Sequence, residues 1–246
     1  MSVRNSMKEY LSLSSRFNRL SPEIIILFLA IYFAAVLNFP VNKALYQLAG
    51  QPAFFITSAL MLTGCFIIIF SLILWRFTCK PIMILLIISS ATTLYATLEY
   101  NVFFDYSMIE NIVETHTGEA FSYVNTHAIV FVTVFGVLPC FWLLHLNMLS
   151  PHPWYMSLLR RVILICIGVM ILAITAIFFY KDYVSIGRNN PYLKKMINPA
   201  HVYNAIKYIN KRYFTKAPLY RTQGIDAKIL PTTNAKPTLL VLVYWC

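Results

Sequence analysis

Residues 53–75 read AFFITSALMLTGCFIIIFSLILW and contain no charged side chain. A helix needs about 20 mainly apolar residues to cross the ~30 Å hydrocarbon core of a bilayer, so this stretch is long enough to span a membrane. The composition of the whole chain agrees, because 59% of its 246 residues are hydrophobic and only 12% are charged. Soluble domains have about 25% charged residues, and disordered chains are poor in apolar ones. We therefore expect an integral membrane protein.

Four further apolar stretches are candidates for membrane spans. Together with residues 53–75 they predict an all-α membrane domain, residues 1–181, with five transmembrane helices at about 22–42, 53–75, 81–98, 127–149 and 162–180. The first span is the weakest, because Asn38 and Pro40 interrupt the apolar run that begins at Ile24.

The basic residues are unevenly divided between the two sides that five spans define. Eight Lys and Arg residues precede the first span or follow the second and fourth spans, including Arg160 and Arg161, whereas the opposite short loops contain only Lys43. Cytoplasmic loops are enriched in Lys and Arg, so we expect a cytoplasmic N-terminus and a C-terminus on the other side. The remaining eleven basic residues follow Tyr180, in a long tail to which this rule, based on short loops, does not apply.

The segment between the third and fourth predicted spans is acidic. Residues 99–126 contain five of the nine Asp and Glu residues and no Lys or Arg. Residues 108–120 read as a short helix in which Asn111, Thr115 and Glu119 recur every four positions and share one face. An amide, a hydroxyl and a carboxylate beside a membrane suit a cationic, hydrogen-bonding headgroup. The alternative, which the spacing alone favours, is the solvated face of an amphipathic surface helix.

The tail after the last span contains a second helical pattern. Val202, Ile206, Ile209 and Tyr213 follow amphipathic helical spacing, with Lys and Arg among them. Such a helix suits the headgroup region of a bilayer or packs on a following soluble domain. Nucleic-acid binding is disfavoured, because the tail is expected outside the cytoplasm. Residues 215–236 read as a linker, so we assign 182–236 to a bridging helix and linker.

The end of the sequence has the pattern of a strand. Residues 238–245 read TLLVLVYW, a continuous apolar run typical of a central strand in a parallel sheet. Such a strand needs neighbouring strands and covering helices, and it would promote aggregation if exposed. We therefore expect residues 237–246 to be the truncated start of a soluble α/β domain.

Cysteine and histidine spacing does not predict a metal site. No CxxC pair is present, and the four cysteines before Cys246 lie in or beside apolar runs, where they are interpreted as small core residues. His116 has no second His or Cys at helical spacing. We expect no metal ligand in this chain.

Several features together make the chain similar to a known family. They are the five spans with their orientation, the segment Met108-Ile-Glu-Asn111 with Glu114-Thr115 and Glu119, the approach Lys236-Pro-Thr-Leu-Leu-Val-Leu-Val243, and the Asn198-Pro199 region. Over residues 20–243 the chain resembles the N-terminal part of the lipid A phosphoethanolamine transferases, of the EptA and mobile colistin resistance types. The resemblance implies a bacterial inner-membrane domain joined by a periplasmic bridging helix to an alkaline-phosphatase-like domain.

The resemblance also implies a chemistry. In that family a zinc-activated threonine transfers phosphoethanolamine from phosphatidylethanolamine to lipid A, which gives resistance to polymyxins such as colistin. Asn111, Thr115 and Glu119 match positions that bind the substrate, with Glu119 pairing with the ethanolamine ammonium. The sequence departs from the family at Tyr244-Trp245-Cys246, where Val-Gly-Glu is expected. We therefore expect no catalytic residue, no bound zinc and no transferase activity from this chain alone.

Two other functions are alternatives. A non-catalytic inner-membrane protein that binds a lipid or a partner would use the acidic segment without chemistry. A small transporter is disfavoured, because transport sites have ionisable residues or broken helices at mid-membrane, and spans two to five have no charged residue at their centres.

Overall fold

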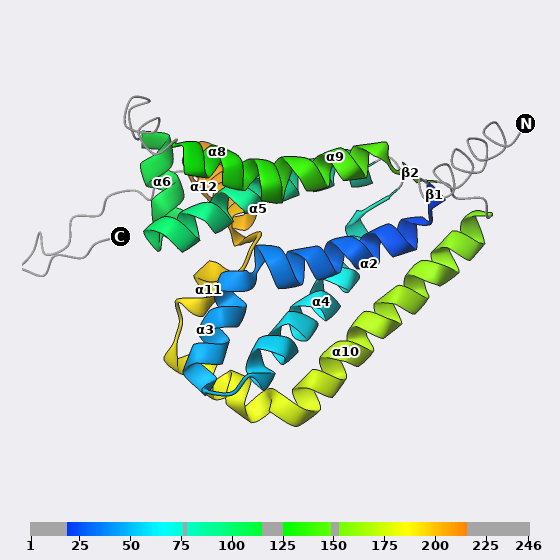
Figure 1. The fold of residues 1–246 in the computed structure, drawn as a ribbon, viewed down its shortest axis with the longest axis horizontal. Coiled ribbons are helices and arrows are strands. Elements are labelled where there is room, and N and C mark those ends of the chain that lie inside the picture. The colour runs from blue at the N-terminus through cyan, green and yellow to red at the C-terminus, as the bar shows by residue number, and fades with distance from the viewer. Residues whose placement is uncertain (1–18, 76–77, 115–124, 149–152, 216–246) are drawn as a thin grey trace, which may run out of the picture.

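The computed structural model describes residues 19–75, 78–114, 125–148 and 153–215, which form a bundle of helices (Figure 1). Within these residues four helical stretches are long and apolar enough to cross a membrane. They are α4 (Ala53–Ile73), α5 (Cys79–Tyr100), the continuous run of α8 (Thr126–Val132), η2 (Thr133–Val137) and α9 (Leu138–His145), and α10 (Trp154–Asn189). A bent helix pair makes a fifth candidate, so the expectation of a multi-span, mostly helical membrane domain is confirmed.

The bent pair corresponds to the first predicted span. α2 (Pro22–Tyr32) continues through a π-helical turn, η1 (Phe33–Leu37), and after Asn38 the chain enters α3 (Phe39–Ala49) at an angle of 57°. Pro40 accounts for the break, because its nitrogen has no hydrogen to donate and its ring clashes with the preceding turn. The change of direction therefore falls inside the range predicted for this span.

Buried asparagine side chains satisfy the backbone carbonyls at this bend. The amide nitrogens of Asn38, Asn42 and Asn198 donate to the carbonyls of Phe33, Ala34 and Leu37, respectively, at 2.8–2.9 Å. An unpaired carbonyl in a membrane interior is costly, so a bend there needs side-chain partners. The asparagines allow the helix to turn without leaving these carbonyls unpaired.

A second proline is accommodated in the fourth span. Pro139 cannot donate to the carbonyl of Phe135, four residues earlier. The hydroxyl of Tyr32 in α2 donates to that carbonyl instead. This hydrogen bond joins the first and fourth spans, and its acceptor is the carbonyl that Pro139 leaves without a helical donor.

The contact between α4 and α10 is close. Gly64 and Gly168 face each other, and a Cβ atom built on Gly168 would lie 2.9 Å from the Gly64 carbonyl oxygen. Only glycine permits two helix backbones to approach in this way. This pair of residues sets the separation of the two helices.

α10 has 36 residues and extends beyond the predicted span 162–180 at both ends. Arg160 and Arg161, expected in a loop, therefore lie in the helix. Arg161 is buried, donates from Nη1 to the carbonyl of Ser71 at 2.9 Å, and lies 4.8 Å from the ring centroid of Trp75. Ser71 is in the last turn of α4, where unpaired carbonyls and the helix dipole favour a cation.

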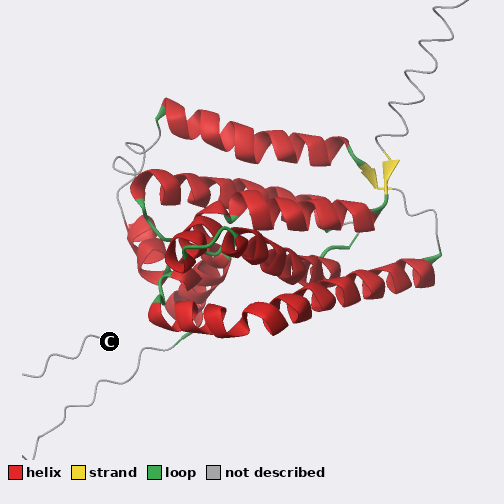
Figure 2. Ribbon diagram, turned by 60° about the horizontal axis from the view of Figure 1, so that its bottom comes forward, coloured by secondary structure: helices red, strands yellow, loops and turns green. Residues whose placement is uncertain are grey.

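The remaining elements lie at the two ends of the bundle. β1 (Arg19–Leu20) and β2 (Asn147–Met148) form a short parallel pair at one end (Figure 2). α3, α6 (Tyr106–Glu114) and α11 (Leu193–Met196) lie at the other (Figure 1), and α12 (Ala200–Ile209) with the π-helical η3 (Asn210–Phe214) packs on α6. The strand predicted at 238–245 lies outside the described residues.

Candidate functional site

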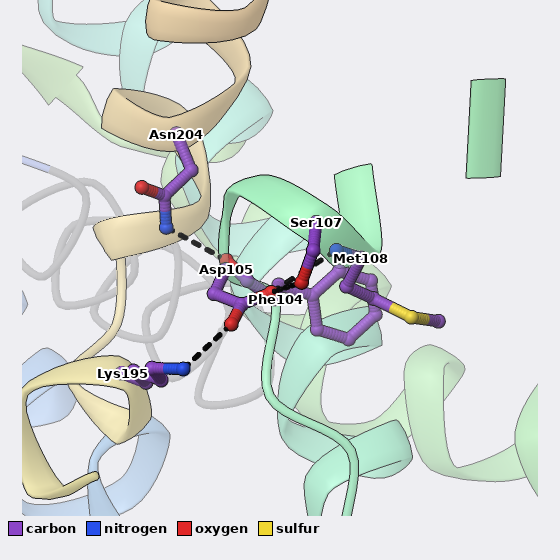
Figure 3. Close-up of polar contacts among 6 residues, drawn as sticks. All are labelled: Phe104, Asp105, Ser107, Met108, Lys195 and Asn204. Carbon is purple, nitrogen blue, oxygen red and sulfur yellow. Dashed lines mark hydrogen bonds and ion pairs between the residues drawn. The ribbon is translucent and has the colours of Figure 1, made fainter. Parts of the chain in front are cut away.

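The candidate site is built on α6, the described part of the acidic segment. The helix follows Asp105, whose Oδ1 accepts hydrogen bonds from the backbone N–H of Met108 at 3.0 Å and from the hydroxyl of Ser107 at 2.8 Å (Figure 3). A carboxylate that accepts from the first turn is an N-cap, and it pairs one of the N–H groups that every helix start leaves free. The short helix predicted in this segment is present as far as Glu114.

Asp105 also connects α6 to α11. Its Oδ2 lies 2.7 Å from Nζ of Lys195 (Figure 3). The pKa of the Asp105 carboxyl is lowered to about 2, first by the hydrogen bond from Lys195 and then by those from Met108 and Ser107, which outweigh its partial burial. The Lys195 side chain is 51% exposed, so this ion pair fixes geometry more than it adds stability.

α12 also contacts the start of α6 and the residue before its capping Asp105. Nδ2 of Asn204 donates to the carbonyl of Phe104 at 2.8 Å (Figure 3), just before the capping Asp105. The ring of Tyr208, buried in the α12 interface, packs on Tyr106 with 6.0 Å between ring centroids. α6 is therefore held at its N-terminal end by a polar contact and an aromatic contact from one helix.

Two lysines near the C-terminal end of α12 approach the same ring. Nζ of Lys207 and Nζ of Lys211 lie 5.8 and 5.1 Å from the ring centroid of Tyr106. These distances are in the range of cation–π attraction. The site thus combines an acidic helix with two cations, one on α12 and one on η3.

A buried polar network anchors the chain that leads into α12. Asn38 and Asn198 exchange two hydrogen bonds, from Asn198 N–H to Asn38 Oδ1 at 2.8 Å and from Asn38 Nδ2 to the Asn198 carbonyl at 3.0 Å. Thr93 of α5 donates to Asn198 Oδ1 at 2.8 Å. In the first turn of α12, Nε2 of His201 pairs with the Ser89 hydroxyl at 3.0 Å, and burial lowers the pKa of this histidine to about 4. α12 is therefore attached to two spans.

The predicted substrate-binding residues are only partly within the described residues. Asn111 lies exposed on α6. Thr115 and Glu119 lie outside the described residues, so their common face with Asn111 stays a prediction. The sequence did not reveal Lys195, Asn204 or the lysine pair as partners of this region, because these contacts join residues about 100 positions apart. The capping role of Asp105 is local, three positions before Met108, and an Asp just before a helix is the sequence signal that could have identified it.

The apolar residues of the pattern predicted in the tail do not form the face of α12 that packs on the bundle. Of its four members, Ile206, Ile209 and Tyr213 are 61%, 48% and 72% exposed, and Val202 is half-buried. The face that packs on the bundle carries His201, Asn204 and Tyr208. Next to Lys207, an open groove of about 370 Å³ is lined by Tyr203, Ile206, Lys207, Ile209, Asn210 and Phe214.

Metal-binding groups are not gathered among the described residues of this region. Among the described residues, no three His, Cys, Asp or Glu side chains are placed to hold a metal ion. Of the cysteines, Cys79 and Cys140 are buried as expected of small core residues, whereas Cys166 is exposed on α10. The described residues therefore offer no set of ligands that fits zinc.

Known proteins are similar to this chain in sequence and in fold. The chain is 27% identical over 232 residues to phosphatidylethanolamine transferase Mcr-1 of Escherichia coli, covering 91% of this chain and 42% of that protein. It is 29% identical over 142 residues to phosphoethanolamine transferase EptA of Salmonella typhimurium, covering 57% of this chain and 26% of that protein. The chain thus spans less than half the length of these relatives.

A solved structure has the same arrangement of helices. It is the integral membrane lipooligosaccharide phosphoethanolamine transferase A (EptA) of Neisseria meningitidis, with a TM-score of 0.73 and 25% identity, covering 78% of this chain and 37% of that one. A family model described as phosphoethanolamine transferase EptA/EptB matches residues 62–213, more than half of the chain. The chain is therefore a multi-pass membrane protein that belongs to the EptA/EptB phosphoethanolamine transferase family, of which it represents the N-terminal membrane domain.

Proposed function

We propose that Asn111, Thr115 and Glu119 bind the headgroup of phosphatidylethanolamine. This lipid is the donor in a transfer of phosphoethanolamine to lipid A that confers polymyxin resistance. The observation that carries the proposal is the fixed position of α6. Asp105, Phe104 and Tyr106, which precede or begin the helix, are each held by a contact from α11 or α12. A helix held in this way presents its exposed residues in a constant geometry at one end of the bundle.

Each predicted residue has a role in this proposal. Glu119 pairs with the ethanolamine ammonium, because a carboxylate and an ammonium form a charge-assisted hydrogen bond. Asn111 and Thr115 donate hydrogen bonds to headgroup oxygens. Asn111 is exposed on α6, which supports this role.

The chemical step belongs to the whole protein. The chain departs from the family pattern at Tyr244-Trp245-Cys246, and we propose that the 246 residues alone do not catalyse transfer. Residues 1–181 then form the membrane domain in the bacterial inner membrane with a cytoplasmic N-terminus. Residues 182–236 form the periplasmic bridging helix and linker, and 237–246 begin the catalytic domain.

The experiment measures lipid retention by the purified chain. Detergent-solubilised protein is incubated with phosphatidylethanolamine, and bound lipid is counted by native mass spectrometry for wild type, Glu119→Gln and the control Glu99→Gln. Glu99 belongs to the same acidic segment but lies at the end of α5. We expect about a tenfold loss of retention in Glu119→Gln, the effect of a charge-assisted hydrogen bond, and little change in Glu99→Gln. Equal retention by all three proteins would refute the proposed site.

A second experiment tests the absence of transfer. Expression of the chain alone in a colistin-sensitive Gram-negative host should leave the minimal inhibitory concentration of colistin unchanged. A clear rise in resistance would show that the chain has an activity of its own.

A further inference from the structure

Lys207 and Lys211 lie one helical turn apart and face the same partner. Both side chains are exposed, and both ammonium groups lie over the ring of Tyr106. Within the described residues, the ion pair that involves a lysine is that of Lys195 with Asp105, and neither Lys207 nor Lys211 has an acidic partner. Two like charges one turn apart repel each other, so their convergence on one ring favours an anion as a shared ligand.

The lysines lie between two surfaces of different character. On one side is α6 with Tyr106 and the acidic segment, which includes Glu110. On the other side is the open groove described above, where Tyr203 and Phe214 are 67% and 78% exposed. A ligand held at the lysines would therefore touch an acidic helix at one end and apolar side chains at the other.

This order of surfaces matches a zwitterionic lipid. A phosphate accepts charge-assisted hydrogen bonds from ammonium groups, and an ammonium pairs with carboxylates. In phosphatidylethanolamine a two-carbon link joins the ammonium to the phosphate, and the phosphate joins the glycerol and its acyl chains. The acidic helix, the lysine pair and the groove follow the same sequence of cation site, anion site and apolar site.

We propose that Lys207 and Lys211 bind the phosphate of the phosphatidylethanolamine headgroup and that the adjoining groove receives the start of its apolar part. The proposal rests on the proposed function, since it takes the same lipid as ligand and places its ammonium at the acidic segment. Tyr106 holds both ammonium groups near the phosphate position, and α12 is held in turn by Asn204 and by the buried network around Asn198.

The experiment compares three lipids and four proteins. The full chain in detergent is offered an equimolar mixture of phosphatidylethanolamine, phosphatidylglycerol and phosphatidylcholine, and bound lipids are counted by native mass spectrometry. The proteins are wild type, Lys207→Gln/Lys211→Gln, Lys207→Arg/Lys211→Arg and Lys194→Gln. Lys194 is an exposed lysine of α11, and its replacement controls for the loss of a positive charge away from the proposed site. Far-UV circular dichroism checks the fold of each variant.

We expect wild type to prefer phosphatidylethanolamine. The double glutamine variant should retain about five- to tenfold less of it, as two partly exposed charge-assisted hydrogen bonds are lost. The double arginine variant should bind within about twofold of wild type, because a guanidinium also binds phosphate. Lys194→Gln should be unchanged, and added salt should weaken binding to wild type more than to the double glutamine variant.

The outcomes separate this proposal from the proposed function. If Glu119→Gln loses the lipid and the double glutamine variant keeps it, the lysine assignment is refuted while the ammonium site stands. If the double glutamine variant loses the lipid and Glu119→Gln keeps it, the lysines are supported and the ammonium site falls. If wild type prefers phosphatidylglycerol and the lysine variants lower its retention equally, the lysines are a general anionic-lipid surface and the proposal is refuted.

Discussion

Replacement of Gly168 by alanine tests the close crossing of α4 and α10. A Cβ atom at this position would lie 2.9 Å from the carbonyl oxygen of Gly64 and 2.9 Å from Cγ1 of Ile68. The first of these atoms belongs to a helix backbone, so the contact is relieved only if the two helices move apart. Overpacking of this kind costs about 1–3 kcal/mol.

The same helix supplies the control. Gly187 also lies in α10, and a Cβ atom there would meet no atom within 4 Å. Alanine in a helix interior is favoured over glycine by about 1 kcal/mol, and both variants gain this contribution. The difference in the free energy of unfolding between Gly168→Ala and Gly187→Ala therefore isolates the cost of the crossing, and we expect it to be about 1–3 kcal/mol.

The assay is unfolding of the purified protein in mixed micelles by titration with sodium dodecyl sulfate, followed by far-UV circular dichroism. Gly64→Ala should be destabilised as well, since its Cβ would lie 3.0 Å from the Gly168 carbonyl oxygen. The double variant Gly64→Ala/Gly168→Ala should cost less than the sum of the two, because the helices separate only once. Equal stability of Gly168→Ala and Gly187→Ala would refute the reasoning.

Two further variants test the polar network. Asn38→Ala removes the partner of the Asn198 N–H and the donor to the Phe33 carbonyl, so we expect a loss of about 2–5 kcal/mol in the same titration, and a loss below about 1 kcal/mol would contradict this role. The pKa of His201 is lowered to about 4 from 6.5 in the folded state, so the unfolded chain binds the proton first. Wild-type stability is therefore complete above pH 6.5 and falls as the pH is lowered toward 4, by up to roughly 3 kcal/mol, whereas His201→Gln should show a flatter profile over the same range.

The membrane spans were predictable because they depend on local composition. An apolar run such as residues 53–75 partitions into lipid whatever its neighbours are, so α4 matches its predicted range within two residues. The break at Pro40 was also visible, because the missing N–H of proline is a local property. How that break is stabilised was not visible, since Asn198, which caps the Leu37 carbonyl, lies 161 positions away.

Part of the candidate site was likewise predictable from local sequence, and part was not. The acidic segment and a short helix within it followed from charge and spacing, and the structure confirms the helix over Tyr106–Glu114. The tail was predicted to form an amphipathic helix, and α12 is present, but the apolar pattern did not reveal which face packs on the bundle. His201, Asn204 and Tyr208 pack there because α5, α6 and the segment between them present polar and aromatic partners.

The sequence by itself determined that this chain spans a membrane several times, which segment is acidic, and which family it resembles. These properties are carried by single residues and short runs. Only the tertiary structure decided that Arg161 is buried against the end of α4, and that Lys207 and Lys211 converge on Tyr106. Each of these contacts joins elements about 90–100 positions apart, and packing of the whole bundle selects them from many arrangements that local patterns allow equally.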